Sequence, residues 1–280
     1  MAKKKSKSAQ DSVQAKARQM REAQDRADRQ TRNVIIGVVA VVILAIVATL
    51  VFVVKEQTKT VTTESGNAGT ALPEQYANGE PIVISHLGVG QKDEDLQDLE
   101  MYFSFSCSWC AYLQDSVGPE LEKSATNGDY NLVLQPVNTA YAPFQGPATA
   151  AALWVAAEAP DQFLAFNQAL AEFFFDAVQT GDKDIIMDLD ASQQKVNDIA
   201  ARANVPQEVI EKFVSDASGY LSASTAKWTE REVDGREGGT GTPELIFKDS
   251  KVPWAQGTPE EIMASITAGL DSLGYQPGQK

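Results

Sequence analysis

The two cysteines of this 280-residue chain stand three residues apart, in Cys107-Ser108-Trp109-Cys110. An aromatic-rich run typical of a buried strand precedes them, and sequence with helical character follows. A helix start leaves N–H groups unpaired and carries partial positive charge, which favours a thiolate over a thiol. Residues i and i+3 share a helical face, so the two sulfurs can close a short disulfide. The motif therefore predicts a redox site with Cys107 as the attacking sulfur and Cys110 as the resolving one.

Two other roles for the cysteine pair remain open at this point. A purely structural disulfide would close so short a loop that it would constrain little of the unfolded chain. A zinc site is disfavoured because His86 is the only other soft ligand, and four ligands are usual. No metal, nucleotide or flavin signature is present, so we expect no cofactor beyond the redox-active disulfide itself.

Charge and hydropathy divide the chain near its start. Residues 1–33 carry ten Lys and Arg against four Asp and Glu, and the remaining residues have a net charge of −20. Such an acidic body argues against nucleic acid as a partner. Val34–Val54 is free of charged residues and long enough to span a bilayer as a helix. The apolar run is too long and its basic flank too large for a cleaved signal peptide, so we expect an uncleaved single-pass anchor.

The basic flank predicts that residues 1–33 are cytoplasmic and that the rest of the chain is extracytoplasmic, where disulfides persist. Residues 55–80 are rich in Thr, Ser, Gly and Ala and predict a flexible linker, followed by a folded domain at 81–275 and a tail at 276–280. The periodicities predict strands at 81–85, 99–105, 131–137 and 244–248, an edge strand at 252–255, and helices at 107–125, 148–159, 161–178, 191–203, 206–233 and 258–273. Pro119 should kink or divide the helix after the cysteines.

This α/β order resembles a thioredoxin-like fold with an inserted α-helical subdomain at about 146–236, preceded by one N-terminal transmembrane helix. More narrowly, it is similar to the membrane-anchored, DsbA-like thiol:disulfide oxidoreductases of Gram-positive, especially actinobacterial, bacteria. The resemblance rests on the run from Phe103 to Cys110 and on Gly238-Gly239-Thr240-Gly241-Thr242-Pro243. It implies that Cys107 is the nucleophile, Cys110 the resolving cysteine and Pro243 a cis-proline. The backbone of Thr242 would then pair with an extended substrate.

The chain departs from the family pattern in residues that should tune the site. Ser108 and Trp109 stand where Pro or His is common, so thiolate stabilisation must rest on helix-start N–H groups and the Ser108 hydroxyl. Ser104 occupies a position where many relatives carry an acid, for which Glu100 is a candidate substitute. Glu244 follows Pro243, and a carboxylate near the cysteines would raise the pKa of a thiolate there.

The resulting prediction is an extracytoplasmic enzyme that introduces disulfides into exported proteins with reduced cysteines. A membrane partner of the DsbB or vitamin K epoxide reductase type would reoxidise Cys107 and Cys110. Two alternatives stay open: a membrane-anchored thiol reductase or isomerase, and a redox-inactive thioredoxin-like binding module with a structural disulfide. The direction of electron flow distinguishes a reductase or isomerase from the predicted oxidase. Cys107→Ser should abolish turnover in a redox enzyme but leave the function of a binding module nearly intact.

Overall fold

The structure, a computed structural model, describes residues 72–139 and 142–276. The predicted cytoplasmic segment, the predicted membrane span at Val34–Val54 and most of the predicted linker lie outside these residues. No helix in the described part of the chain is long and apolar enough to cross a bilayer.

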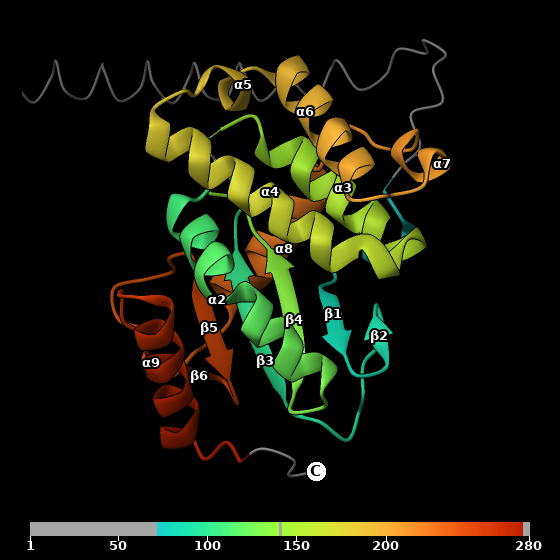
Figure 1. Cartoon of the computed structure of the whole chain (residues 1–280). Coiled ribbons are helices and arrows are strands. Elements are labelled where there is room, and N and C mark those ends of the chain that lie inside the picture. The colour runs from blue at the N-terminus through green and yellow to red at the C-terminus, as the bar shows by residue number, and fades with distance from the viewer. Residues whose placement is uncertain (1–71, 140–141, 277–280) are drawn as a thin grey trace, which may run out of the picture. The chain divides into compact units, whose positions relative to one another are not determined.

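A mixed six-stranded sheet forms the centre of the described region (Figure 1). Its strands run in the order β2-β1-β4-β3-β5-β6, and β3 pairs in parallel with β4 while the other neighbours are antiparallel. The bounds are β1 Ile82–Ser85, β2 Gly88–Val89, β3 Asp98–Phe103, β4 Asn131–Pro136, β5 Glu244–Phe247 and β6 Ser250–Lys251. The central strands β3 and β4 are largely buried on both faces, as parallel pairs usually are.

Helix α2 (Ser108–Thr126) connects β3 to β4 and covers one face of the sheet together with α9 (Pro259–Ser272) (Figure 1). Pro119 lies inside α2, which continues past it as a single helix, so the predicted division does not occur. Helix α9 begins with the predicted capping box, in which Thr258 and Glu261 bond each other's backbone N–H groups. The order β3–α2–β4 followed by β5–β6–α9 is a thioredoxin-like arrangement, as the sequence indicates.

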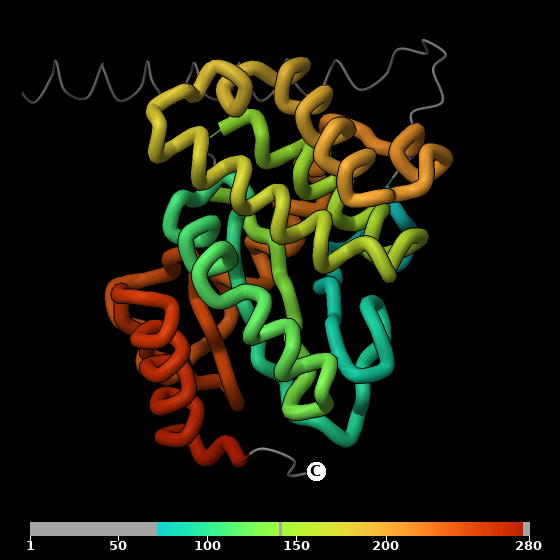
Figure 2. Tube along the Cα trace, in the orientation of Figure 1, coloured from blue at the N-terminus to red at the C-terminus, as the bar shows by residue number. Residues whose placement is uncertain are grey.

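The described residues between β4 and β5 form six helices, and most of these pack beyond the end of the sheet to which α2 brings its first turn (Figures 1 and 2). Their bounds are α3 Gln145–Glu158, α4 Pro160–Thr180, α5 Asp184–Met187, α6 Leu189–Arg202, α7 Gln207–Ile210 and α8 Ser218–Glu230. Phe163, Phe166 and Phe174 are fully buried, so these aromatic side chains form part of the core of the helical region. Helix α8 packs on the other face of the sheet, where Trp228 meets Tyr102.

Residues 72–80, expected as the end of a flexible linker, are instead packed against the domain. Tyr76, in the short 3₁₀ helix η1 (Glu74–Tyr76), is buried. Gly79 adopts a positive φ of 74° and lies so close to the α8 backbone that a Cβ would overlap Ser224. Tyr220 Oη donates to the carbonyl of Glu80 at 3.0 Å. The folded region therefore includes Leu72–Glu80, which its Gly- and polar-rich composition conceals.

Two element predictions in the C-terminal half are wrong. The helix expected over 206–233 is instead two helices, α7 and α8, and the segment between them packs on α3, where the Ser215 carbonyl lies so close to Gly146 that a Cβ would overlap it. The edge strand expected at 252–255 lies earlier, as β6, because Lys248 and Asp249 form a tight turn with positive φ and pairing starts directly after it. Beyond that pairing stands Pro253, which has no N–H to contribute.

Candidate functional site

Cys107 occupies the N-cap position of α2, directly after the turn that leaves β3. Its backbone is extended, with φ −104° and ψ 119°, and its N–H donates to the Ser104 carbonyl at 3.1 Å. The Cys107 Sγ accepts the N–H of Cys110 at 3.4 Å, as the side chain of an N-cap residue does. The sulfur is thus fixed at the helix start while the residue remains partly exposed.

The surroundings of Cys107 lower its pKa to about 6. The main cause is the hydrogen bond from the Cys110 thiol, against a smaller opposing effect of burial. A hydrogen bond with the Thr242 side chain and then the backbone N–H groups of Cys110 and Trp109 lower the pKa further. The helix-start N–H groups therefore take part in stabilising the thiolate, as expected from the absence of histidine between the cysteines, whereas the Ser108 hydroxyl is not among the causes of the shift.

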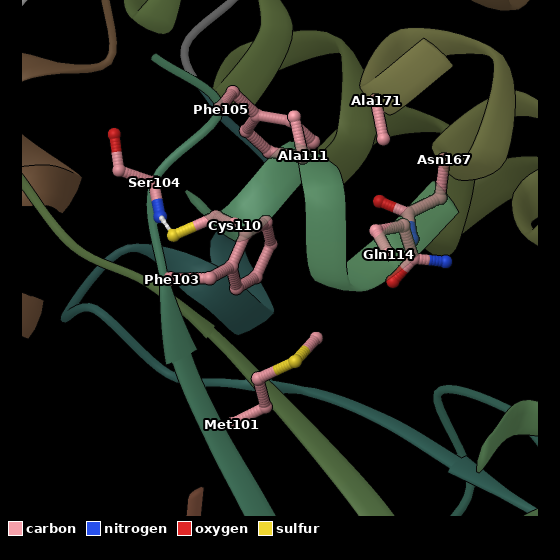
Figure 3. Close-up of a pocket in the computed structure, with 9 residues that line it drawn as sticks. All are labelled: Met101, Phe103, Ser104, Phe105, Cys110, Ala111, Gln114, Asn167 and Ala171. Atoms are coloured by element: carbon pink, nitrogen blue, oxygen red, sulfur yellow. Dashed lines mark hydrogen bonds between the residues drawn. The ribbon is translucent and has the colours of Figure 1, made fainter. Parts of the chain in front are cut away.

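Cys110 has the opposite character. It is buried, and burial raises the pKa of its thiol well above the ordinary value. Its Sγ accepts the backbone N–H of Ser104 at 3.5 Å (Figure 3). Both cysteines are reduced in this structure. The pair is thus divided into an accessible cysteine of lowered pKa, Cys107, and a protected thiol of raised pKa, Cys110.

The Thr242–Pro243 segment faces the first cysteine. The peptide bond between these residues is cis, and the Cys107 thiol donates to the Thr242 carbonyl oxygen at 3.5 Å. This contact is placed by the sheet, because β5 begins directly after Pro243 and pairs with β3, the strand that leads to the cysteines. The structure thereby brings Cys107, Cys110, Thr242 and Pro243 together.

Glu244 does not lie where the sequence suggested. It pairs across the sheet with Tyr102, on the face covered by α8, and is fully buried there. Arg236 holds its carboxylate in a two-pronged ion pair at 2.6 and 3.0 Å, and Trp228 Nε1 donates to it at 2.6 Å. Glu244 is not among the causes of the Cys107 pKa shift. Its structural role is to anchor the strand that follows Pro243.

Glu100 is likewise directed away from Cys110. Its carboxylate pairs with Arg231 and accepts the Tyr102 hydroxyl, on the same sheet face as Glu244. Glu122 is a buried acid on the cysteine side of the sheet, and burial raises its pKa to about 7.

Glu122 accepts a hydrogen bond from Gln114 Nε2 at 2.9 Å, and the two residues lie on the same face of α2, eight positions apart. Gly118 lies between them, and a Cβ there would overlap the Gln114 amide. Gln114 and Asn167 line a small cavity of about 20 Å³ that reaches Cys110, with Met101, Phe103 and Phe105 as its apolar wall (Figure 3). The i, i+4, i+8 spacing of Gln114, Gly118 and Glu122 was the available sequence signal for this arrangement.

Ser104 belongs to a buried hydrogen-bonded cluster beneath the cysteines. Its hydroxyl donates to Gln145 Oε1 at 2.6 Å, and the Ser106 hydroxyl donates to the same oxygen at 2.8 Å. Gln145 Nε2 donates to the Val137 carbonyl at 2.6 Å, and the Thr139 hydroxyl donates to Ser104 Oγ at 2.8 Å. Sequence reasoning missed Gln145, which is 41 residues from Ser104 and carries no motif.

The residues between the cysteines lie at the surface. Ser108 is exposed, and Trp109 is 47% exposed beside Tyr112. With Phe175 and Val178 of α4 they line a groove of about 340 Å³ next to the cysteines. In residues 72–139 and 142–276, no three His, Cys, Asp or Glu side chains are grouped as metal ligands would be.

Comparison with solved structures reveals similar folds. MdbA from Actinomyces oris, described as a thiol-disulfide oxidoreductase, is 24% identical with a TM-score of 0.56, over 74% of this chain and 96% of that one. MdbA from Corynebacterium diphtheriae is 17% identical with a TM-score of 0.47, over 69% of this chain and 100% of that one. Reduced DsbA from Mycobacterium tuberculosis is 18% identical with a TM-score of 0.45, over 69% and 97%. No protein-family model and no curated protein sequence matches the chain.

Proposed function

We propose that the chain is a thiol:disulfide oxidoreductase that introduces disulfides into exported proteins through Cys107 and Cys110. The observation that carries this proposal is the division of the pair: an accessible cysteine with a pKa of about 6 beside a buried cysteine with a raised pKa. A purely structural disulfide needs no such asymmetry, whereas thiol exchange does. The activity described for the similarly folded protein of Actinomyces oris is consistent with this reading.

In the proposed reaction the enzyme begins with the Cys107–Cys110 disulfide. A substrate thiolate attacks Cys107 Sγ, a mixed disulfide forms, and Cys110 leaves as a thiolate that then takes up a proton. A second substrate thiolate attacks the substrate sulfur of the mixed disulfide, which closes the substrate's disulfide and releases Cys107 as a thiolate. Two electrons have then passed from the substrate to the cysteine pair. The low pKa of Cys107 makes it a good leaving group in the second step.

Substrate binding in this proposal uses the backbone beside the nucleophile. The Thr242 carbonyl lies 3.5 Å from Cys107 Sγ, so an extended peptide could pair along Thr242 with its cysteine at the sulfur. The groove beside Trp109 and Tyr112 offers an apolar surface for a neighbouring side chain. Both features suit unfolded polypeptides with varied sequences rather than one small molecule.

The proposal includes the location inferred from the sequence. Val34–Val54 would anchor the chain with the catalytic domain extracytoplasmic, and a quinone-linked membrane protein of the DsbB or vitamin K epoxide reductase type would reoxidise the cysteines. Modification of the reduced Cys107 by a membrane-impermeant maleimide in intact cells tests the orientation. Labelling only after cell lysis would contradict it.

Activity is tested with the oxidised full-length chain and a reduced, unfolded protein that contains one cysteine pair. We expect stoichiometric disulfide formation in the substrate and complete loss with Cys107→Ser. Reduced Cys110→Ser, mixed instead with the disulfide form of the same substrate, should be trapped as a mixed disulfide, because Cys107 opens the substrate disulfide and no Cys110 thiol is present to resolve the product. Ser192→Ala, which removes a buried hydroxyl of α6, serves as a control that leaves the cysteines untouched. Unchanged partner binding and no exchange in either cysteine variant would favour the redox-inactive module instead.

A further inference from the structure

An amide side chain from the helical insertion is bonded to the turn between β3 and α2. Gln145 is the first residue of α3 and is only 4% exposed. Its Oε1 accepts both the Ser104 and the Ser106 hydroxyl, and its Nε2 donates to the Val137 carbonyl at the end of β4. The Gln145 amide therefore accepts two hydrogen bonds from the turn and donates one at the end of β4.

This amide is connected to Cys110 through one residue. The Ser104 hydroxyl donates to Gln145, and the Ser104 backbone N–H donates to Cys110 Sγ at 3.5 Å. The same hydroxyl accepts the Ser106 N–H at 3.1 Å, which closes the turn on itself. The orientation of the Ser104 peptide thus depends on where Gln145 holds its side chain.

The Ser104 N–H faces the atom that becomes charged during exchange. When a thiol opens the Cys107–Cys110 bond at Cys107, the bonding electron pair goes to Cys110 Sγ, which leaves as a thiolate in a buried site. Buried charge is costly without a donor, and an N–H already aimed at the developing charge stabilises it without reorganisation. The Ser104 N–H is in the position to do this.

We propose that Gln145 is a positioning residue that holds the Ser104 N–H on Cys110 Sγ and thereby speeds the opening of the Cys107–Cys110 disulfide. The inference deepens the proposed function, because it concerns the first step of that reaction. Gln145 touches neither sulfur in this scheme and acts only through Ser104.

The test measures how fast dithiothreitol opens the oxidised full-length chain with Gln145→Met, which keeps the volume but removes the hydrogen bonds. We expect a loss of about tenfold, smaller than the 10²–10³-fold cost of deleting an oxyanion donor itself. The thiolate absorbance of reduced Cys107 should still titrate near pH 6, because the groups that set that pKa are Cys110, Thr242 and the helix-start N–H groups. An unchanged opening rate, or a loss matched by a shift in that titration, would overturn the inference.

Gln135→Met is the matched control. Gln135 is another buried glutamine of the same domain, 7% exposed, and its side-chain amide donates to the Gly79 carbonyl and the Tyr220 hydroxyl, away from the cysteines. The disulfide of Gln135→Met should open at the wild-type rate. If this variant lost as much rate as Gln145→Met, the loss would come from a general loosening of the fold, and the inference would be overturned. Should Gln145→Met fail to fold, Ser104→Ala carries the test, since it removes the same tie but keeps the N–H. Where both variants fold, their double variant should lose no more than either alone.

Failure of the proposed function remains distinguishable from failure of this inference. Dithiothreitol opens the disulfide without a protein substrate, so a chain that opens rapidly yet oxidises no protein would refute the function and leave the role of Gln145 standing. If the Gln145→Met variant oxidised proteins as well as the wild type and its disulfide opened equally fast, the role of Gln145 would be refuted and the proposed function would stand.

Discussion

The sulfur of Cys107 lies 3.5 Å from the carbonyl oxygen of Thr242, although 135 positions separate the two residues in the chain. The pairing of β3 with β5 creates this contact, since Cys107 follows one strand and Thr242 precedes the other. The proposed nucleophile and the backbone edge proposed for substrate are therefore fixed by the same two strands, and both should respond to changes in the sheet beneath them.

The reduction potential of the cysteine pair should lie between those of thioredoxin and DsbA. A lower pKa of the nucleophilic cysteine stabilises the reduced form, and about 6 for Cys107 falls between about 7 for thioredoxin and about 3.5 for DsbA. Equilibration in glutathione buffers should therefore give a value between about −270 and about −120 mV. A value at or below the thioredoxin end would support the reductase alternative, and a bond that does not equilibrate would support the structural one.

The stability of the reduced protein should rise with pH above about 6 through ionisation of Cys107. Its folded pKa is depressed, so the unfolded chain binds more protons between pH 6 and about 8.5, and stability increases across that window. Falling pH removes the contribution as it passes through about 6. Urea unfolding at pH 5.5 and pH 8 measures the change.

Cys107→Ser supplies the reference for that experiment, because Glu122 makes the stability of the folded protein fall with rising pH, opposite to the effect of Cys107. The raised pKa of Glu122, about 7, gives stability that is present at low pH and lost as pH rises through 7. The difference between wild type and Cys107→Ser isolates the cysteine. A difference that is independent of pH would contradict the assigned thiolate.

Gly118→Ala should destabilise the protein, although alanine is the better helix former by about 1 kcal/mol. The new methyl group would displace the Gln114 amide and leave Glu122 without that donor in a buried site. A net loss of about 1–2 kcal/mol is expected from the broken hydrogen bond, measured by urea unfolding. Gly219→Ala, in the first turn of α8 with open space around it, should be neutral or stabilising. A stabilised Gly118→Ala would show that the Gln114–Glu122 bond contributes little.

Glu244→Gln should destabilise the fold without changing the pKa of Cys107. Glu244 and Arg236 are 1% and 8% exposed, and breaking a buried ion pair costs about 3–5 kcal/mol. The exposed pair of Lys227 with Glu80 gives the contrast, since Lys227→Met should cost less than about 1 kcal/mol. If Glu244→Gln lowered the Cys107 pKa, the electrostatic influence suggested by the sequence would be real.

The parts of the site that the sequence reveals are those set by local structure. Cys107 and Cys110 can be placed from the chain alone, because a strand-to-helix junction and a helical i, i+3 spacing determine their geometry. Thr242 and Pro243 follow only from a family resemblance. The direction of Glu244 could not be predicted, because a strand alternates its side chains and the register with β3 decides which face each one takes.

The residues that sequence reasoning missed make their contacts through tertiary structure. Gln145 reaches Ser104 from another part of the fold, and nothing in its neighbours marks it. Residues 72–80 read as linker because one buried aromatic residue, Tyr76, stands among small and polar ones. Burial of a single side chain and a close backbone approach at Gly79 decided their state, and neither has a periodic signature.

The position of Gln145 at the first turn of α3 also bears on how such domains can be modified. The helical insertion accepts buried hydrogen bonds from the turn that carries the cysteines, so it cannot be exchanged independently of the thioredoxin-like part of the fold. A chimera that replaced α3 to α8 with another helical segment would need, at the start of that segment, a residue that accepts hydrogen bonds from both the Ser104 and the Ser106 hydroxyl. Without such a residue, the turn that leads to Cys107 would lose its geometry.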